Sequence, residues 1–297
     1  METRAFAVAQ ANKLLERLAF QVTRTRRTPG SDAVHDLRVA IRRFTQSLFV
    51  FKTSFAPRET RKIRKRLKVT MALAGEVRDY DIAIKILEAS RARGAGGFQE
   101  ELLARRKNAA KALQAALDHW VARRSFSKWR TSLQTGVTQP DFHLPKVEDT
   151  SRRLLGRMAE RFFREGDRAS HPQASAAELH EFRIAAKKLR YTLELFAELH
   201  APAANEWMEQ IKPVQTLLGA INDYRSVRAL VSTLGGSHVV EAALRKRQRR
   251  KTQDFRKLWT ERFASPAIPR QWMHSLRRPL RKPIMLEPAE EAVARPA

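Results

Sequence analysis

Two segments of this chain share one layout of residue types, and this repetition is the feature that most constrains the fold. The stretch VHDLRVAIRR begins at Val34, and LHEFRIAAKKLR begins at Leu179, 145 residues later. Both read apolar residue, His, acid, apolar residue, Arg and then further basic residues. A second pair, LAGEVRDYD from Leu73 and LLGAINDYR from Leu217, recurs in the same order at an offset of 144. We interpret the two pairs as an internal duplication, so the chain should fold as two similar halves.

The secondary structure predicted for both halves is helical. Apolar residues recur at steps of three and four, and no stretch alternates in the manner of a strand. The fold class is therefore all-α, with two similar helical bundles related by a pseudo-twofold axis. The helices that we expect cover residues 3–27, 32–54, 57–74, 78–93, 98–135, 147–168, 174–199, 202–219, 222–234 and 237–262.

A segment rich in helix breakers separates the halves. TGVTQPDFHLPK, residues 135–146, contains Gly and two Pro and few helix formers. We therefore expect one domain over 5–262, with a first helical half over 5–136 and a second over 147–262.

The last part of the chain, residues 264–297, is predicted to be a basic tail without fixed structure. It holds six of the thirteen prolines, and Pro lacks the N–H that an interior helical residue donates. Trp272, Met273 and Leu276 are the tail residues that could dock on the domain.

The second motif of each half is predicted to lie at a helix end. Gly75 and Gly219 each follow a Leu-rich stretch, which is typical of a helix C-terminus. Asp79 and Asp223 would then cap the next helix or hold a basic side chain in place.

The repeated helices are predicted to carry a basic side next to an apolar seam. Apolar residues step by three or four from Val34 to Phe51, which is a packing seam. One position along, His35, Arg38 and Arg42 share the neighbouring side of the helix. We expect the helix dipole and the guanidinium groups to lower the pKa of His35. The matching row of the second copy consists of His180, Arg183, Lys187 and Arg190. Neither row contains a carboxylate, so each predicts a linear strip for an anion.

Further basic residues follow the first repeated helix. Arg61, Lys65 and Lys68 step by four and three along one side of the next predicted helix. The corresponding stretch of the second half keeps only Lys212, which matches Lys68. A basic run at residues 244–251, LRKRQRRK, is a weaker candidate for an anion or nucleic-acid patch.

The charge balance favours a polyanionic partner. Lys and Arg total 58 against 31 acidic residues, which gives a formal net charge of +27. Such a charge repels itself and opposes folding, so a chain that keeps it is expected to meet an anionic polymer or surface. Composition alone leaves nucleic acid, polyphosphate, anionic lipid and acidic protein as candidates.

Other classes of protein are disfavoured by the sequence. No run approaches the 18 or more apolar residues of a membrane span, and the N-terminal stretch does not read as a secretory signal. The absence of Cys excludes disulfides and thiolate metal sites and fits a reducing compartment, so we expect a cytoplasmic location without cofactor or metal.

The doubled His-acid-apolar-Arg motif, with its doubled Leu-x-Gly-x-x-x-Asp partner, resembles the CHAD family of conserved-histidine α-helical domains. The resemblance covers about residues 5–262 and implies a basic central groove or pore that binds inorganic polyphosphate. It also implies a standalone form without a fused triphosphate-tunnel enzyme, and an association with polyphosphate granules. The ligand residues that it implies in the first half are His35, Arg38, Arg42, Arg43, Lys68 and Arg78. Those that it implies in the second half are His180, Arg183, Lys187, Lys188 and Lys212. Asn222 stands where the first half has Arg78, so the first half should contribute more.

Two other functions remain as alternatives. A phosphoryl-transfer or polyphosphate-hydrolysing enzyme would need carboxylates to hold Mg²⁺ near the phosphates, and the basic rows contain none. A nucleic-acid-binding protein fits the charge, but most aromatic residues lie on predicted core seams, which leaves phosphate contacts as the means of binding. We therefore expect a non-catalytic polyphosphate-binding protein, with nucleic acid as the alternative ligand.

Overall fold

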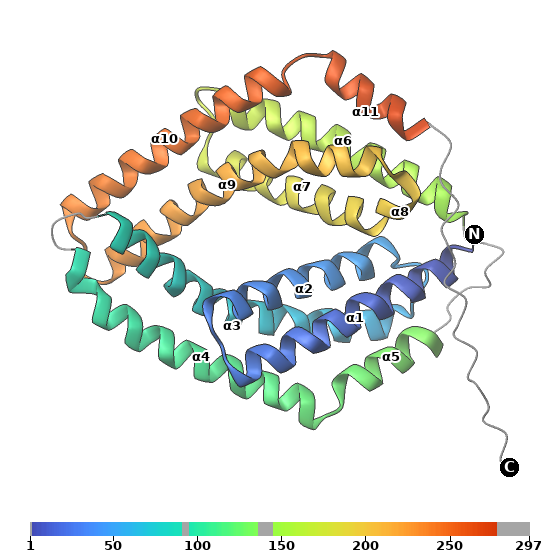
Figure 1. Ribbon diagram of the computed structural model, residues 1–297, viewed down its shortest axis with the longest axis horizontal. Coiled ribbons are helices and arrows are strands. Elements are labelled where there is room, and N and C mark those ends of the chain that lie inside the picture. The colour runs from blue at the N-terminus through green and yellow to red at the C-terminus, as the bar shows by residue number, and fades with distance from the viewer. Residues whose placement is uncertain (1, 91–94, 136–144, 278–297) are drawn as a thin grey trace, which may run out of the picture.

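The computed structural model of the chain describes residues 2–90, 95–135 and 145–277 (Figure 1). Within these ranges every regular element is helical, which confirms the all-α prediction. The elements are α1 (Thr3–Arg27), α2 (Ser31–Val50), α3 (Pro57–Ser90), the 3₁₀ turn η1 (Ala95–Phe98), α4 (Gln99–Ala122), α5 (Ser125–Thr135), α6 (Val147–Ser170), α7 (Ala176–Leu195), α8 (Ala197–His200), α9 (Ala203–Thr233), α10 (His238–Arg262) and α11 (Ala267–Arg277).

The helices form two groups that face each other (Figure 1). Helices α1 to α5 lie on one side, and α6 to α11 lie on the other. The groups touch where α2 packs on α7 and where α3 packs on α9. The helices with the repeated His motif, α2 and α7, therefore lie at the contact between the groups. The duplication itself remains an interpretation of the sequence.

A side-chain cap fixes the start of α7. The Ser175 hydroxyl accepts a hydrogen bond from the Glu178 backbone N–H at 3.2 Å, and the Glu178 carboxylate accepts one from the Ser175 N–H at 2.7 Å. This reciprocal arrangement satisfies two N–H groups that a helix start leaves without acceptors. It sets the first turn of α7 directly before His180.

The predicted apolar seams are buried and orient the basic rows. Val34, Leu37 and Phe44 of α2 are completely covered. At the ends of α2 and α7, the rings of Phe51 and Phe196 meet edge to face with centroids 5.7 Å apart. These two residues hold matching positions in the repeat. Because the seams are fixed in this way, Arg38 and Arg42 of α2 and Arg183 and Lys187 of α7 line the space between the helices.

A second, smaller apolar cluster joins the two groups away from α2 and α7. It combines residues of α3 and α4 with residues of α9 and α10: Ala83, Leu87, Leu102, Val227, Val231, Val240 and Leu244. The two groups are therefore held together at two separate places.

Two pairs of predicted helices are single long helices. The expected breaks after residues 74 and 219 do not exist, because α3 runs over 34 residues and α9 over 31. Gly75 and Gly219 lie inside these helices, so the prediction that they end a helix is wrong. Asp79 and Asp223 consequently cap nothing. Conversely, the single helix expected over 98–135 consists of two helices. It is interrupted between α4 and α5, where Arg124 has a φ of 48°.

The prediction of a tail without structure from residue 264 is wrong for residues 267–277, which form α11. Trp272 and Leu276 are buried, and the Trp272 ring stacks on Trp207 of α9 with centroids 4.3 Å apart. Pro269 is tolerated because it lies in the first turn, where backbone N–H groups have no acceptor within the helix. The expectation for residues 278–297 lies outside the described residues.

None of the helices in the described ranges is long and apolar enough to span a membrane.

Candidate functional site

A groove of about 870 Å³ opens between α2, α3 and α7. We call it the basic groove, because nine of its lining residues are Lys or Arg and none of the described lining residues is acidic. The basic residues are Arg38, Arg42, Arg61, Arg64, Lys65, Lys68, Arg183, Lys187 and Lys188. The other lining residues are Ile41, Thr45, Gln46, Leu67, Met71, Ile184 and Tyr191. Cations from both helix groups thus converge on one space.

Eight of the fourteen residues predicted from the sequence line this groove. They are Arg38, Arg42, Arg61, Lys65, Lys68, Arg183, Lys187 and Lys188. The sequence reading missed Arg64 and Tyr191. A signal for both existed, since Arg64 lies three residues after Arg61 and Tyr191 lies four after Lys187, and such spacings share one side of a helix.

Arg38 is held in the groove by a contact with α3. Its Nη1 atom donates to the Met71 carbonyl oxygen at 3.2 Å. A Cβ placed on Gly75 would lie 2.8 Å from the same atom, which is too close. Gly75 therefore makes room for the guanidinium. At the matching position, a Cβ on Gly219 would meet nothing within 4 Å.

The deeper cations of the groove are crowded together. Burial and then the Arg42 charge lower the pKa of Arg38 to about 10. Burial and then the Arg183 charge lower the pKa of Lys187 to about 7. Burial is also the main cause of the lowered pKa of Arg183. The groove thus brings many cationic side chains close together, which is the electrostatic condition for binding an anion.

Two carboxylates lie near the deep cations without lining the groove. Asp79 of α3 attracts Arg38, and Asp223 of α9 attracts Arg183 and Lys187. Burial raises the pKa of the Asp223 carboxyl, and the nearby Arg183 opposes this rise. The second role expected for these acids, that of holding basic side chains in place, fits this arrangement.

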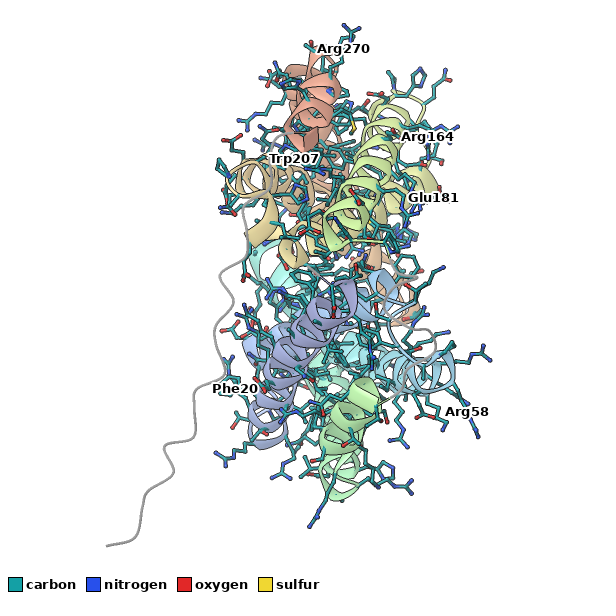
Figure 2. All side chains as sticks on the ribbon, turned by 90° about the vertical axis from the view of Figure 1, so that its right-hand side faces the viewer. Phe20, Arg58, Arg164, Glu181, Trp207 and Arg270 are labelled. Carbon is teal, nitrogen blue, oxygen red and sulfur yellow. The ribbon has the colours of Figure 1, made fainter. Side chains whose placement is uncertain are left out.

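The outer part of the groove is formed by exposed basic residues. Arg61, Arg64, Lys65 and Lys68 extend from α3, and Lys188 extends from α7. At the start of α3, Arg58 points away from the body of the molecule, as Figure 2 shows, and is not part of the lining. The exposed members of the groove can approach a ligand without rearrangement of the core.

Arg43 and Arg190 lie outside the groove and share one carboxylate. Glu194 of α7 accepts hydrogen bonds from Arg43 Nε at 2.6 Å and Arg43 Nη2 at 3.1 Å. It also accepts one from Arg190 Nε at 3.1 Å. Because Arg43 belongs to α2, this ion pair ties the two helix groups together. Nearby, Gln46 Nε2 donates to the Thr192 hydroxyl at 3.0 Å across the same contact.

Lys212 also lies outside the groove. It is exposed on α9, and its Nζ lies 3.5 Å from an oxygen of Glu209. The match with Lys68 in the repeat therefore does not bring the two lysines to one site.

His35 and Arg78 stand next to each other beyond the groove lining. His35 is exposed, and Arg78 Nη1 donates to the Ser31 hydroxyl at 2.8 Å. The pKa of His35 is lowered, first by partial loss of contact with water and then by the positive charges of Arg78 and Arg42. This direction was expected from the sequence.

His180 lies beside a separate small cavity rather than in the groove. The cavity has a volume of about 20 Å³ and is also lined by Arg183 and Arg225. The Nδ1 atom of His180 is buried and has no hydrogen-bond partner among the described residues. The structure therefore places neither repeated His in the lining of the basic groove.

Comparison with protein families gives one match over most of the chain. The sequence model of the CHAD domain matches residues 9–232. Among curated proteins, the uncharacterized proteins Rv2226 and MT2285 from two strains of Mycobacterium tuberculosis are each 24% identical over 239 residues. The matched region is 73% of this chain but 42% of each relative, so the chain spans less than half the length of these relatives.

Solved structures show the same fold. The crystal structure of the CHAD domain from the plant Ricinus communis matches with a TM-score of 0.64 and 21% identity, over 94% of each chain. PptA from Streptomyces chartreusis matches with a TM-score of 0.58 and 13% identity, over 93% of this chain and 99% of that one.

Proposed function

Because the chain belongs to the CHAD domain family, we propose that its basic groove binds inorganic polyphosphate and that it does so without catalysis. The observation that carries the proposal is the convergence of nine Lys or Arg residues from α2, α3 and α7 on one groove whose described lining has no carboxylate. The family membership supports polyphosphate as the ligand, and the gathering of cations supports the groove as its binding site.

The chemistry of the groove suits a chain of phosphates. Polyphosphate presents negatively charged oxygens along a flexible backbone and has no bases or sugars to recognise. A row of cations can follow such a backbone by charge and hydrogen bonds alone. The planar guanidinium groups of Arg38, Arg42 and Arg183 can each hold two phosphate oxygens, while the exposed Lys188 supplies a point charge.

A binding role rather than catalysis is supported by the composition of the lining. Enzymes that transfer phosphoryl groups use carboxylates to place Mg²⁺ against the phosphates. Among the described residues, no group of three or more potential metal ligands gathers anywhere. Release of inorganic phosphate from polyphosphate in the presence of Mg²⁺ would overturn the non-catalytic part of the proposal.

The test compares three polyanions at one ionic strength. Long-chain polyphosphate, single-stranded DNA and heparin are titrated against the protein. We expect polyphosphate to bind at least about tenfold more tightly, a difference of about 1.4 kcal/mol. Equal affinity for all three would contradict a polyphosphate site, and a preference for DNA would move the function to nucleic-acid binding.

A matched pair of variants locates the binding site. The double substitution Arg61→Glu and Lys188→Glu reverses two exposed charges in the groove. The control Arg249→Glu and Arg250→Glu reverses two exposed charges on α10. Both variants change the net charge equally, so only the groove variant should lose most of its affinity. Equal losses would mean that overall charge or the basic run on α10, not the groove alone, binds the ligand.

The same binding would bring the protein to polyphosphate granules in the cytoplasm. A fluorescent fusion should collect on granules, whereas the groove variant should spread evenly through the cell.

A further inference from the structure

We propose that Lys187 is a site of covalent acylation by acyl phosphates, with the basic groove directing the reagent to its amine. An acyl phosphate joins an electrophilic carbonyl to a phosphate anion. The proposal uses the same groove as the polyphosphate proposal, but it does not require polyphosphate to be the natural ligand.

Lys187 has an unusual position among the lysines. It lines the groove from α7, one turn after Arg183, and the charges of Arg42 and Arg38 act on it from α2. Within the described part of the chain its Nζ forms no hydrogen bond or ion pair. The amine is therefore free to react and is surrounded by groups that bind phosphate.

The surroundings of Lys187 also favour the reactive form of the amine. Only the neutral amine is a nucleophile, and an ordinary exposed lysine is almost entirely protonated at neutral pH. Burial and three nearby guanidinium groups lower the pKa of Lys187 to about 7, with Asp223 opposing the shift. A large share of Lys187 is then neutral under physiological conditions.

The reaction balances without any further reagent. The lone pair of Nζ attacks the carbonyl carbon of the acyl phosphate and forms a C–N bond. The bond between that carbon and the phosphate oxygen breaks, and inorganic phosphate leaves with the electron pair. The amine proton passes to water or to the departing phosphate. Arg183 and Arg42 lie where they can hold the phosphate and stabilise its negative charge as it leaves.

The product would change the groove. An amide at Lys187 has no positive charge and is larger than the amine, so one cation is lost and part of the groove is filled. Acylation should therefore weaken the binding of any polyanion in the groove.

The experiment treats the folded full-length chain with acetyl phosphate at pH 7.5 and measures the acetylation rate of each lysine by mass spectrometry. Lys257 is the internal reference, because its side chain is 76% exposed and lies on α10. We expect Lys187 to react at least about tenfold faster than Lys257 in the folded protein. The two rates should become similar in the urea-unfolded chain. A Lys187 rate no higher than that of Lys257 in the folded protein would overturn the proposal.

Two controls test the role of the groove. An uncharged acetylating reagent should show a smaller preference for Lys187 than acetyl phosphate does, because it has no phosphate to bind. Arg42→Gln should slow acetylation of Lys187 by acetyl phosphate, whereas Arg249→Gln should not. The same preference with both reagents, or no effect of Arg42→Gln, would contradict direction by the groove.

The outcomes separate the two proposals. A chain that binds polyphosphate but is not selectively acetylated overturns only the acylation site. A chain that is acetylated at Lys187 but does not prefer polyphosphate overturns only the proposed function.

Discussion

Gly75 and Gly219 hold matching positions in α3 and α9 but have different neighbours. The space above Gly75 is filled by the Arg38 guanidinium, and the space above Gly219 is open. A glycine inside a helix is less favourable than alanine by about 1 kcal/mol. The two glycines should therefore respond differently to the same substitution.

Gly219→Ala should raise the free energy of unfolding by up to about 1 kcal/mol, as measured by urea denaturation. Gly75→Ala should gain less, because the new methyl group displaces Arg38 from its hydrogen bond with Met71. It should also weaken polyphosphate binding, which Gly219→Ala should leave unchanged. Equal effects of the two substitutions on affinity would argue against Gly75 as the support of Arg38.

Lys187 should link ligand binding to pH. Its charged neighbours are Arg38 and Arg42 on α2, Arg183 on α7 and Asp223 on α9. In the free protein its pKa is about 7, below the ordinary value of 10.5. A polyanion favours the protonated amine, so binding at pH 8 should take up on the order of one proton per site. Calorimetry in buffers of different ionisation enthalpy measures this uptake, and Lys187→Met should abolish it.

The same group should affect stability in the absence of ligand. Between about pH 7 and 10.5 the unfolded chain keeps a proton on Lys187 that the folded chain has lost. The unfolded state then binds more protons, so this lysine makes stability rise with pH across that window. Urea denaturation of the wild type and of Lys187→Met at pH 7 and 9.5 should show a rise that the variant lacks. A rise of equal size in both proteins would contradict the assignment.

The sequence predicted eight of the nine Lys and Arg residues of the groove, but not which of the predicted cations are paired within the protein instead. Periodicity shows that two residues share one side of a helix, but it does not show what lies opposite them. Arg43 and Arg190 meet Glu194, which no spacing rule connects to Arg43 because the two lie 151 residues apart. His35 and His180 were selected because they recur, and recurrence does not distinguish a residue in a groove from one beside it.

At the scale of helices, the sequence predicted where most helices lie and failed mainly at their ends. Glycine is a local signal for a helix C-terminus, and it was misleading at residues 75 and 219 because tertiary packing outweighs propensity. Proline was misleading in residues 267–277, where it predicted a tail but the chain forms α11. A proline within the first turn opposes a helix only weakly, and Trp272 packing stabilises α11. Neither effect is visible without the neighbouring helices.

The α2–α7 contact should depend strongly on Glu194. Its carboxylate is largely covered, with 19% of the side chain exposed, and it accepts bonds from Arg43 and Arg190. Glu194→Ala leaves both guanidinium groups without this partner and should lower the free energy of unfolding by about 2 kcal/mol. Glu198→Ala is the control, because Glu198 and Lys13 form an ion pair with both side chains more than half exposed. The control should change stability by less than about 1 kcal/mol, and similar losses would contradict the role of Glu194.

For the whole molecule, binding of polyphosphate should depend steeply on salt. Each cation that contacts a phosphate releases condensed counterions. For single strands, each contact adds about −0.7 to the slope of log affinity against log salt concentration. If all nine groove cations engage, the total slope should be about −6. Titrations between low and physiological salt measure this slope. The slope of the Arg61→Glu and Lys188→Glu variant should be clearly shallower than that of the wild type. A slope near −1 would mean that few of the nine cations touch the ligand.

The stacking of Trp272 on Trp207 has a consequence for how the protein can be divided. The match to the family model ends at residue 232, inside α9, but the rings of Phe162 and Phe182 contact Trp259 of α10. A chain cut at that limit would lose α10 and α11 and leave aromatic surface bare, which favours self-association. The stretch that the family model matches is therefore shorter than the stretch needed to cover these rings, so a shortened protein should keep at least the residues up to 277.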